Sequence, residues 1–444
     1  MMTPSKPAPP SAPTPAPTPA PTPEDRLYRI VEEGMCIGCG LCESLAGPES
    51  VKMQVVDSGF ERPLVVGALS HETVDAIYDT CPGTRVEALP ADLAAQASSR
   101  DLVWGPHESF VEAWAGDPAV RHEGSTGGVL TALGQFLVDS GEVEFLLHAK
   151  AGGNDPTFGQ PHVSETAAEV LAGAGSRYGP TAVLQTVHQN LDKGRPFAFV
   201  GKPCDISALR ALARRDARVN QLIKYFLTPV CGGFASPKAT EAFIENHHGV
   251  QKPEIESFRY RGFGCPGPTT FKTADGQSHA ATYTEYWGED EKSWNVPWRC
   301  KICPDGIGEG ADIAAADNWP GGAPDPAIEA DDPGTNAVIV RTKAGADLVA
   351  RAVAAGYLVT GSRLDADHMS TVQPHQVKKR QAARARWDGM ASQGRMTPRT
   401  HGLRLDALRE TLSDEVYEAQ RKGTAQRIQD GRAGEERPKA KNGL

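Results

Sequence analysis

The sequence predicts an α/β fold in which a parallel or mixed sheet follows a small cysteine-bearing unit. Three observations lead to this prediction. From about residue 100, short apolar runs alternate with helical patterns, as in sheets with crossover helices. Three cysteines at two-residue intervals precede this region. The chain of 444 residues is long enough for two or three domains.

The first segment, residues 1–25, is rich in proline and lacks the side chains that build a core, so we expect an extended, disordered tail. It contains no apolar stretch of the kind found in signal peptides. Residues 26–95 form the small unit, which has few apolar residues and would depend on a bound metal for stability.

Residues 100–395 form the main domain. Its predicted strands are FLLHAK, FAFVGKP, LIKYFLTPV and NAVIVRT, and its predicted helices are VLTALGQFLVDSGEV (ending at Gly141), AAEVLAGAG, ISALRALARR and GADLVARAVAAGYLV. Strands and helices in this alternation favour parallel strands. Within residues 378–404, eight Lys or Arg predict a solvated helix packed on the domain, or a helix that contacts a partner. Residues 396–444 are expected to be a helical or disordered C-terminal tail.

The composition excludes some classes of protein. A formal charge of -10 argues against binding to nucleic acid, which requires a basic face. Nothing approaches the roughly 18 consecutive apolar residues that a transmembrane helix needs. Nine cysteines without an export signal belong in a reducing compartment, where they are more often metal ligands than disulfides. We therefore expect a cytoplasmic protein.

The first cysteine group is Cys36-x2-Cys39-x2-Cys42, which lets one loop wrap three corners of an iron–sulfur cluster. Cys81, followed by Pro82, offers the fourth ligand, with the intervening segment forming a hairpin or loop. This pattern predicts a ferredoxin-like 4Fe-4S domain. The alternative is zinc, which prefers two separated Cys pairs.

A second group combines Cys204, Cys231, Cys300 and Cys303. Cys204 and Cys231 each follow a predicted strand, so both are expected at the carboxyl edge of the sheet, where ligands gather. Cys300-x2-Cys303 adds two thiolates on one turn. Spacing alone fits a second cluster, a zinc site or buried structural cysteines. Cys265 lies outside both groups and is predicted to be a spectator.

Two loops are candidate anion sites. Ser125, Thr126, Gly127 and Gly128 precede a predicted helix, whose free N–H groups and dipole favour a phosphate. Ser176, Arg177 and Tyr178 combine a hydroxyl, a guanidinium and an aromatic face. An ordinary helix cap and a plain surface turn are the alternatives. Two G-x-G-x-x-G-like stretches lack the preceding strand of a dinucleotide fold and are discounted.

The stretches GSTGGVLTAL, GSRYGPTAV, GKPCDISALRAL, CGGFASP and WRCKICPDGIGEGADIAAADNW together resemble the coenzyme F420 hydrogenase/dehydrogenase beta-subunit family. The resemblance covers roughly residues 26–360. It implies FAD in the α/β domain beside a 4Fe-4S cluster held by Cys204, Cys231, Cys300 and Cys303, and a second 4Fe-4S cluster in the N-terminal domain. It also implies FAD contacts by the two candidate loops, with Lys202, Asp312 and Asp317 as further candidates.

Family relatives include ferredoxin-dependent 7-hydroxymethyl chlorophyll reductase and 8-vinyl chlorophyllide reductase. We therefore expect electrons to pass from a ferredoxin-like carrier through both clusters and FAD to a small organic substrate such as a tetrapyrrole. The alternative within the enzyme class is a beta subunit that exchanges hydride with coenzyme F420. A zinc-binding, non-catalytic assembly protein and a simple electron relay are alternatives of other classes. Either a homo-oligomer or one subunit of a complex fits these expectations, and no residue is singled out as the proton donor.

Overall fold

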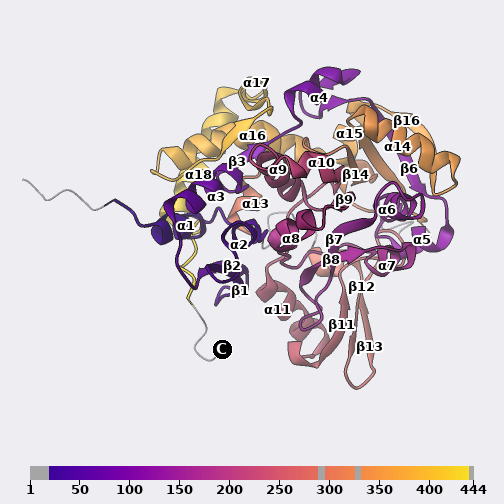
Figure 1. Cartoon of the computed structure of the whole chain (residues 1–444), viewed down its shortest axis with the longest axis horizontal. Coiled ribbons are helices and arrows are strands. Elements are labelled where there is room, and N and C mark those ends of the chain that lie inside the picture. The colour runs from indigo at the N-terminus through magenta and orange to yellow at the C-terminus, as the bar shows by residue number, and fades with distance from the viewer. Residues whose placement is uncertain (1–19, 289–295, 326–331, 440–444) are drawn as a thin grey trace, which may run out of the picture.

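The computed structural model describes residues 20–288, 296–325 and 332–439, and its centre is an eight-stranded sheet (Figure 1). The strand order is β16-β6-β15-β14-β10-β9-β7-β8. In chain order the strands are β6 (Ser109–Ala115), β7 (Phe145–Ala151), β8 (Gly159–Ser164), β9 (Phe197–Val200), β10 (Ile223–Pro229), β14 (Ile313–Asp317), β15 (Asn336–Val340) and β16 (Leu358–Leu364).

The sheet is mixed, which is one of the two arrangements that the sequence predicts. Strands β7, β9, β10 and β14 are parallel, and Leu227 of β10 lies opposite Val200 of β9 and Ile313 of β14. The other four strands are antiparallel to their neighbours. The four strands predicted from apolar runs all form, as β7, β9, β10 and β15.

Helices cover both faces of the sheet. One apolar core packs α8, α9 and α10 against β7, β9 and β10, and the other packs α6 and α14 on the opposite face. Helix α6 begins after Gly128, whose φ of 72° suits glycine, and ends before Gly141. The helices are α6 (Val129–Asp139), α7 (Ala167–Ala172), α8 (Val187–Asp192), α9 (Pro203–Leu212), α10 (Arg218–Leu222) and α14 (Lys343–Ala354).

The N-terminal unit is built from short helices around one hairpin. Its elements are α1 (Pro23–Glu32), α2 (Leu41–Ala46), β1 (Val51–Val55), β2 (Glu61–Val65), α3 (His71–Thr80), β3 (Arg85–Glu87) and α4 (Ala91–Gln96). The β1–β2 hairpin fills the segment between the third and fourth cysteines. Helix α1 begins before residue 26 because Thr22 caps it and Pro23 starts it. The remaining tail, residues 1–19, lies outside the described residues.

The C-terminal region packs on the N-terminal unit instead of forming a separate tail. Its elements are α16 (Pro374–Ala391), β17 (Arg399–His401), α17 (Leu405–Arg409) and α18 (Asp414–Gln429). Ile30 of α1, Trp387 of α16 and Leu408 of α17 share one core, and Figure 1 shows the yellow and indigo helices side by side. Within the predicted C-terminal tail the structure has the helices α17 and α18, and residues 440–444 lie outside the described residues.

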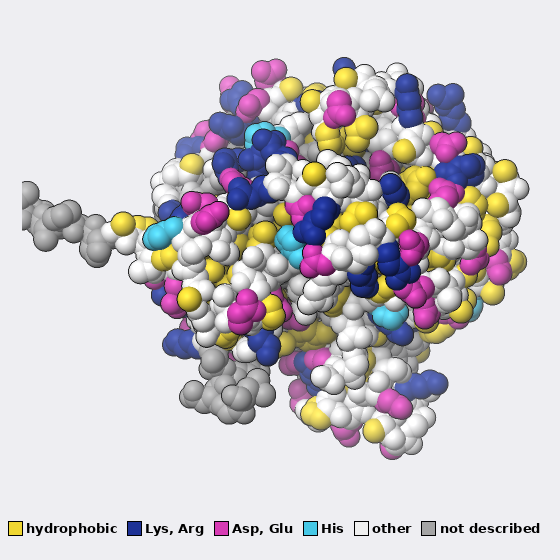
Figure 2. Space-filling model, viewed as in Figure 1, with side chains coloured by type: hydrophobic (Ala, Val, Ile, Leu, Met, Phe, Trp, Pro, Cys, Tyr) yellow, Lys and Arg dark blue, Asp and Glu magenta, His cyan; other side chains and the backbone are white. Residues whose placement is uncertain are grey.

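The remaining elements surround this frame. They are β4 (Ser99–Asp101), β5 (Gly105–His107), α5 (Pro118–Glu123), α11 (Pro237–His248), β11 (Ile255–Arg259), β12 (Thr269–Thr273), β13 (Ser278–Ala281), α12 (Tyr283–Trp287), α13 (Trp298–Lys301) and α15 (Ala366–Val372). Acidic and basic side chains are interspersed over the face shown in Figure 2. None of the described helices is both long and apolar enough to cross a bilayer.

Candidate functional site

The N-terminal cysteines form one group, which we call the outer quartet: Cys36, Cys39, Cys42 and Cys81. The first three lie on or beside the loop between α1 and α2, and Cys81 caps the end of α3. Burial raises the pKa of all four thiols, and repulsion from neighbouring thiols of the quartet raises it further for Cys39, Cys42 and Cys81. The fold thus brings together the four cysteines that the sequence pattern assigns to one group.

Backbone N–H groups point at the sulfur atoms of the outer quartet. The N–H of Gly38 donates to Cys36 Sγ and that of Gly83 donates to Cys81 Sγ, each at 3.4 Å. Backbone hydrogen bonds from Leu41 and Glu43 favour the charged forms of Cys39 and Cys42. Hydrogen bonds to cysteine sulfur are one of the means by which proteins adjust iron–sulfur clusters.

The second group, the inner quartet, comprises Cys204, Cys231, Cys300 and Cys303. Cys204 lies in the first turn of α9 and Cys231 follows β10, so both occupy the carboxyl edge of the sheet. All four line one small cavity together with Lys202, Arg299 and Lys379. Burial raises the pKa of Cys231 to about 12, with Cys300 and Cys303 raising it and Lys379 lowering it. The positive charges of Lys202, Arg299 and Lys379 suit a site at which negatively charged thiolates lie close together.

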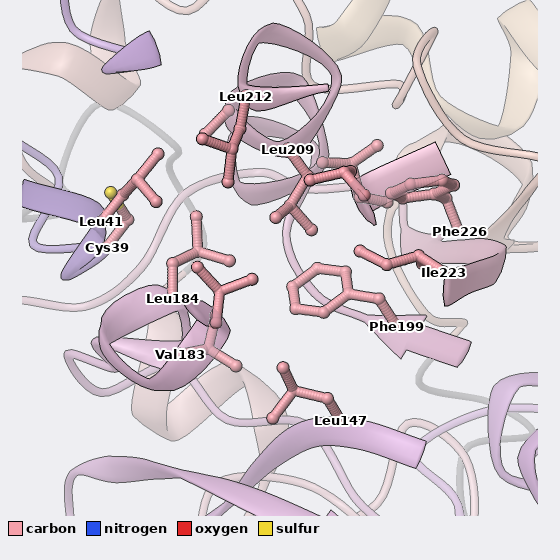
Figure 3. Close-up of a cluster of buried hydrophobic side chains, with 14 of the residues drawn as sticks. Cys39, Leu41, Leu147, Val183, Leu184, Phe199, Leu209, Leu212, Ile223 and Phe226 are labelled. Carbon is pink, nitrogen blue, oxygen red and sulfur yellow. The ribbon is translucent and has the colours of Figure 1, made fainter. Parts of the chain in front are cut away.

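The two quartets are neighbours. Ile37, from the outer-quartet loop, lines the cavity of the inner quartet. Cys39 belongs to the same apolar core against which Cys204 and Cys300 pack. Figure 3 shows Cys39 and Leu41 beside Leu184 and Leu212 of the main domain. Among the described residues, no three His, Cys, Asp or Glu side chains are arranged to hold a single metal ion.

A cavity of about 320 Å³ opens beside the inner quartet, and the two spaces share Lys202, Cys231, Gly233 and Phe234 as walls. Its volume falls at the lower end of ligand-binding sites. Most predicted cofactor residues line it: Ser125, Thr126, Gly128, Ser176, Arg177, Tyr178, Lys202 and Asp317. The N–H of Ser176 donates to Ser125 Oγ at 2.5 Å, which joins the two predicted loops.

Two predicted residues do not line this cavity. A side chain at Gly127 would meet the carbonyl oxygen of Ala113 at 2.9 Å, so this glycine serves close packing against the sheet. Asp312 is buried, accepts hydrogen bonds from the N–H of Phe226 at 2.8 Å and from Thr342 at 2.7 Å, and joins β10 to the start of α14. Its position gives no support to the predicted contact with FAD.

Arg261, which the sequence does not single out, is the hub of the cavity wall. It is 2% exposed and binds Asp317, with Nη1 at 3.1 Å from Oδ2. It also donates to the carbonyl oxygen of Ser125 at 2.7 Å and to Tyr178 Oη at 3.1 Å. Its guanidinium carbon lies 4.8 Å from the centre of the Trp319 ring. Arg261 therefore fixes three predicted residues in one wall.

Several features of the cavity fit an anionic aromatic ligand such as a flavin dinucleotide. Gly128 gives α6 no side-chain cap, and Val129, Leu130 and Thr131 of its first turn line the cavity, where the N–H of Val129 donates to Asn336 Oδ1 at 3.4 Å. Arg177 Nε is buried without a hydrogen-bond partner, and burial lowers the pKa of Arg177 to about 10. A bound phosphate would supply the missing acceptor. Trp287 and Trp319 add aromatic walls.

Helix α16 also reaches the site. His375 lines the large cavity, and burial lowers its pKa to about 4, so the imidazole is neutral at pH 7. Lys379 lines the small cavity and Gln376 Nε2 donates to the carbonyl oxygen of Cys231 at 2.9 Å. Arg380 is fully buried and pairs with Glu309. The basic stretch of α16 thus packs on the domain, and Lys379 brings one positive charge to the inner site.

Glu61 provides a prediction about pH. Burial raises its pKa to about 7, although Lys202 and Arg62 favour its charge. Because the carboxyl group binds its proton more tightly when folded, stability should fall as pH rises from about 4.5 to 7, by up to about 3 kcal/mol. Glu61→Gln should remove this dependence. Thermal unfolding of both full-length proteins at pH 5 and pH 8 measures it, and equal losses in the two would contradict it.

Family profiles match this chain over two adjoining stretches. Residues 110–188 match the profile for the N-terminal part of the coenzyme F420 hydrogenase/dehydrogenase beta subunit, and residues 194–365 match the profile for its C-terminal part. These stretches carry the large cavity loops and the inner quartet. The outer quartet, α16 and the C-terminal segment lie outside them.

Curated relatives are similar over parts of the chain. "F420-dependent formate dehydrogenase 1 subunit beta" of Methanococcus maripaludis is 29% identical over 211 residues, 46% of this chain and 50% of the relative. "Coenzyme F420-dependent sulfite reductase" of Methanocaldococcus jannaschii is 23% identical over 341 residues, 73% of this chain and 47% of the relative. The chain spans about half the length of the curated relatives it matches.

A solved structure shares the fold. A chain of the F420-reducing NiFe hydrogenase complex from Methanosarcina barkeri superposes with a TM-score of 0.51 at 20% identity. The match covers 66% of this chain and 96% of the other.

Proposed function

Because the chain belongs to the coenzyme F420 hydrogenase/dehydrogenase beta-subunit family, we propose that it is an F420-linked oxidoreductase subunit with FAD in the large cavity and a 4Fe-4S cluster at each quartet. The observation that carries this proposal is the common wall between the large cavity and the inner quartet, formed by Lys202, Cys231, Gly233 and Phe234. Centres that share a wall are close enough to exchange electrons.

When bound, a flavin exchanges electron pairs as hydride and releases electrons singly to iron–sulfur clusters. The chain's own residues prepare the site for this chemistry. Arg177 and the open end of α6 hold negative charge, and Arg261 orients Asp317 and Tyr178. Lys202 and Lys379 balance the thiolates of the inner quartet. Buried apolar side chains pack around both quartets.

The relatives favour the F420-linked hypothesis over ferredoxin-driven reduction of an organic substrate such as a tetrapyrrole. Both curated relatives described above are F420-dependent by name. A ferredoxin-like carrier is the second candidate partner, and the outer quartet is the observation that favours it. The outer quartet lies outside the stretches that match the family profiles, and a second cluster there would let the chain accept electrons from a soluble carrier.

The experiment is anaerobic purification followed by quantification of iron, acid-labile sulfide, zinc and released flavin. We expect about eight iron, eight sulfide and one FAD per chain. Reduced F420 should then bleach the flavin and cluster absorption, and reduced ferredoxin serves as the competing donor. Bleaching by ferredoxin alone would favour the second candidate. A colourless protein with zinc and no flavin after cluster reconstitution would overturn the proposal.

A further inference from the structure

We propose that Arg62, held in place by Glu435 of the C-terminal segment, is a cation shared by both quartets that sets the reduction potentials of the centres they hold. The inference rests on the proposed function, since it requires a cluster at each quartet. Neither residue lies in the stretches that match the family profiles. It assigns a redox role to a segment that the sequence predicts only as a tail.

Arg62 lies against the outer quartet. It is on β2 and is fully buried. Its Nη1 would be 3.4 Å from a methyl group at Gly38, one of the two residues between Cys36 and Cys39. The same nitrogen donates to the carbonyl oxygen of Glu61 at 2.8 Å. A guanidinium is charged at any pH a protein tolerates, so a permanent positive charge is buried beside the loop that carries three cysteines.

On its other side, Arg62 is connected to the inner quartet through two aromatic rings. Its guanidinium carbon lies 4.7 Å from the centre of the Phe60 ring. Phe60 packs edge-on against Phe234, with ring centres 5.8 Å apart. Phe234 lines both cavities, and its backbone hydrogen bond favours the charged form of Cys300. Phe60 and Phe234 thus link Arg62 to the inner site by direct contact.

The charge of Arg62 acts on both quartets. Burial raises the pKa of the Cys36 thiol, whereas Arg62 lowers it. Although burial opposes the guanidinium charge, Cys36, Glu435 and Cys300 together raise the pKa of Arg62. Reduction of a cluster by one electron adds one negative charge to its site. A buried cation stabilises that added charge and therefore raises the reduction potential.

Glu435 opposes this effect. Its carboxylate binds Arg62 in a bidentate pair, with Nε–Oε2 and Nη2–Oε1 distances of 2.7 Å each, and it raises the pKa of Cys36. The segment that carries it is fixed to α1: Ala433 is buried, the N–H of Glu435 donates to the carbonyl oxygen of Glu32 at 3.2 Å, and Arg437 pairs with Glu32 at 2.8 Å. The segment of residues 433–437 thus determines how strongly the charge of Arg62 acts on the outer quartet.

These charges give the direction in which each substitution should shift the reduction potentials. Glu435→Gln removes the opposing charge and should raise both potentials, with the larger shift at the outer cluster. We expect at least a tenfold change in the one-electron equilibrium there, which corresponds to about 59 mV. The double variant Arg62→Gln/Glu435→Gln removes both charges and keeps neutral hydrogen-bonding side chains. It should lower the outer potential below that of the unmodified protein, because Arg62 lies nearer to the cysteines.

The test is an anaerobic redox titration of the full-length holoprotein followed by electron paramagnetic resonance, after iron and sulfide have been quantified. Arg421→Gln is the matched control, because it removes one charge from an exposed pair on α18, 32% and 41% exposed, that lines neither cavity, and it should leave both potentials unchanged.

Unshifted potentials in Glu435→Gln and in the double variant would overturn the inference, as would loss of the clusters from both, since the pair would then be purely structural. An unmodified protein without clusters would instead overturn the proposed function.

Discussion

Replacement of Cys303 by serine is expected to lower the iron content from about eight to about four per chain and to release the flavin. Cys303 lines the inner cavity with Cys204, Cys231 and Cys300, and that cavity shares four wall residues with the large one. Loss of the inner cluster should therefore disturb both spaces. Iron, sulfide and flavin analysis of the anaerobically purified variant measures the effect.

Two further variants test whether the combined loss of iron and flavin is specific to the inner quartet. Cys39→Ser should lose the outer cluster and keep the flavin, because Cys39 does not line the large cavity. Cys265→Ser should keep all its iron, since Cys265 is buried away from both quartets and accepts a hydrogen bond from Trp319 Nε1 at 3.3 Å. Full iron in Cys303→Ser, or a loss in Cys265→Ser, would show that the inner quartet is wrongly assigned.

Replacement of Arg261 by methionine should destabilise the protein by about 3 kcal/mol and reduce flavin affinity at least tenfold, because removing one partner of a buried ion pair leaves the other uncompensated. Asp317, the carbonyl oxygens of Ser125 and Pro266, and Tyr178 would all lose their guanidinium partner. Thermal unfolding and a flavin titration of the apoprotein measure the two effects separately.

Arg421→Met is the matched control for this prediction. Arg421 pairs with Glu418 on one face of α18, and the two side chains are 32% and 41% exposed. Exposed pairs of this kind contribute between 0 and about 1 kcal/mol. An Arg261→Met protein that melts and binds flavin like the unmodified chain would contradict the role of Arg261 as the hub of the cavity.

Local sequence patterns were sufficient to predict the strands at the centre of the fold. Buried apolar runs predict β7, β9, β10 and β15, and two cysteines that follow parallel strands predict a common edge. The pairing of β6 could not be predicted, because its antiparallel partners β15 and β16 lie more than 200 residues further along the chain. Pairing over such distances leaves no local pattern.

The site residues that the sequence did not predict correctly also depend on contacts between distant segments. Arg261 follows an ordinary strand, and its role arises only from contacts with segments near residues 125, 178 and 317. Asp312 carries a suitable side chain beside the right strand, but its carboxylate is used inside the sheet. Lys379 lies in the basic stretch 378–404, for which the sequence predicts a solvated helix packed on the domain or a partner contact, and its place in the wall of the small cavity was not predicted. His375, just before that stretch, lines the large cavity.

The contact between Glu435 and Arg62 has a consequence for the maturation of the protein. About 400 residues separate Cys36 from Glu435. At usual rates of translation, the first three thiols leave the ribosome roughly 20 to 80 s before Glu435 does. The inner quartet is complete only once Cys303 has emerged, and Lys379 of α16 joins it later still. The thiols of the outer quartet should therefore lack the cover of the Arg62–Glu435 pair during synthesis until Glu435 has emerged.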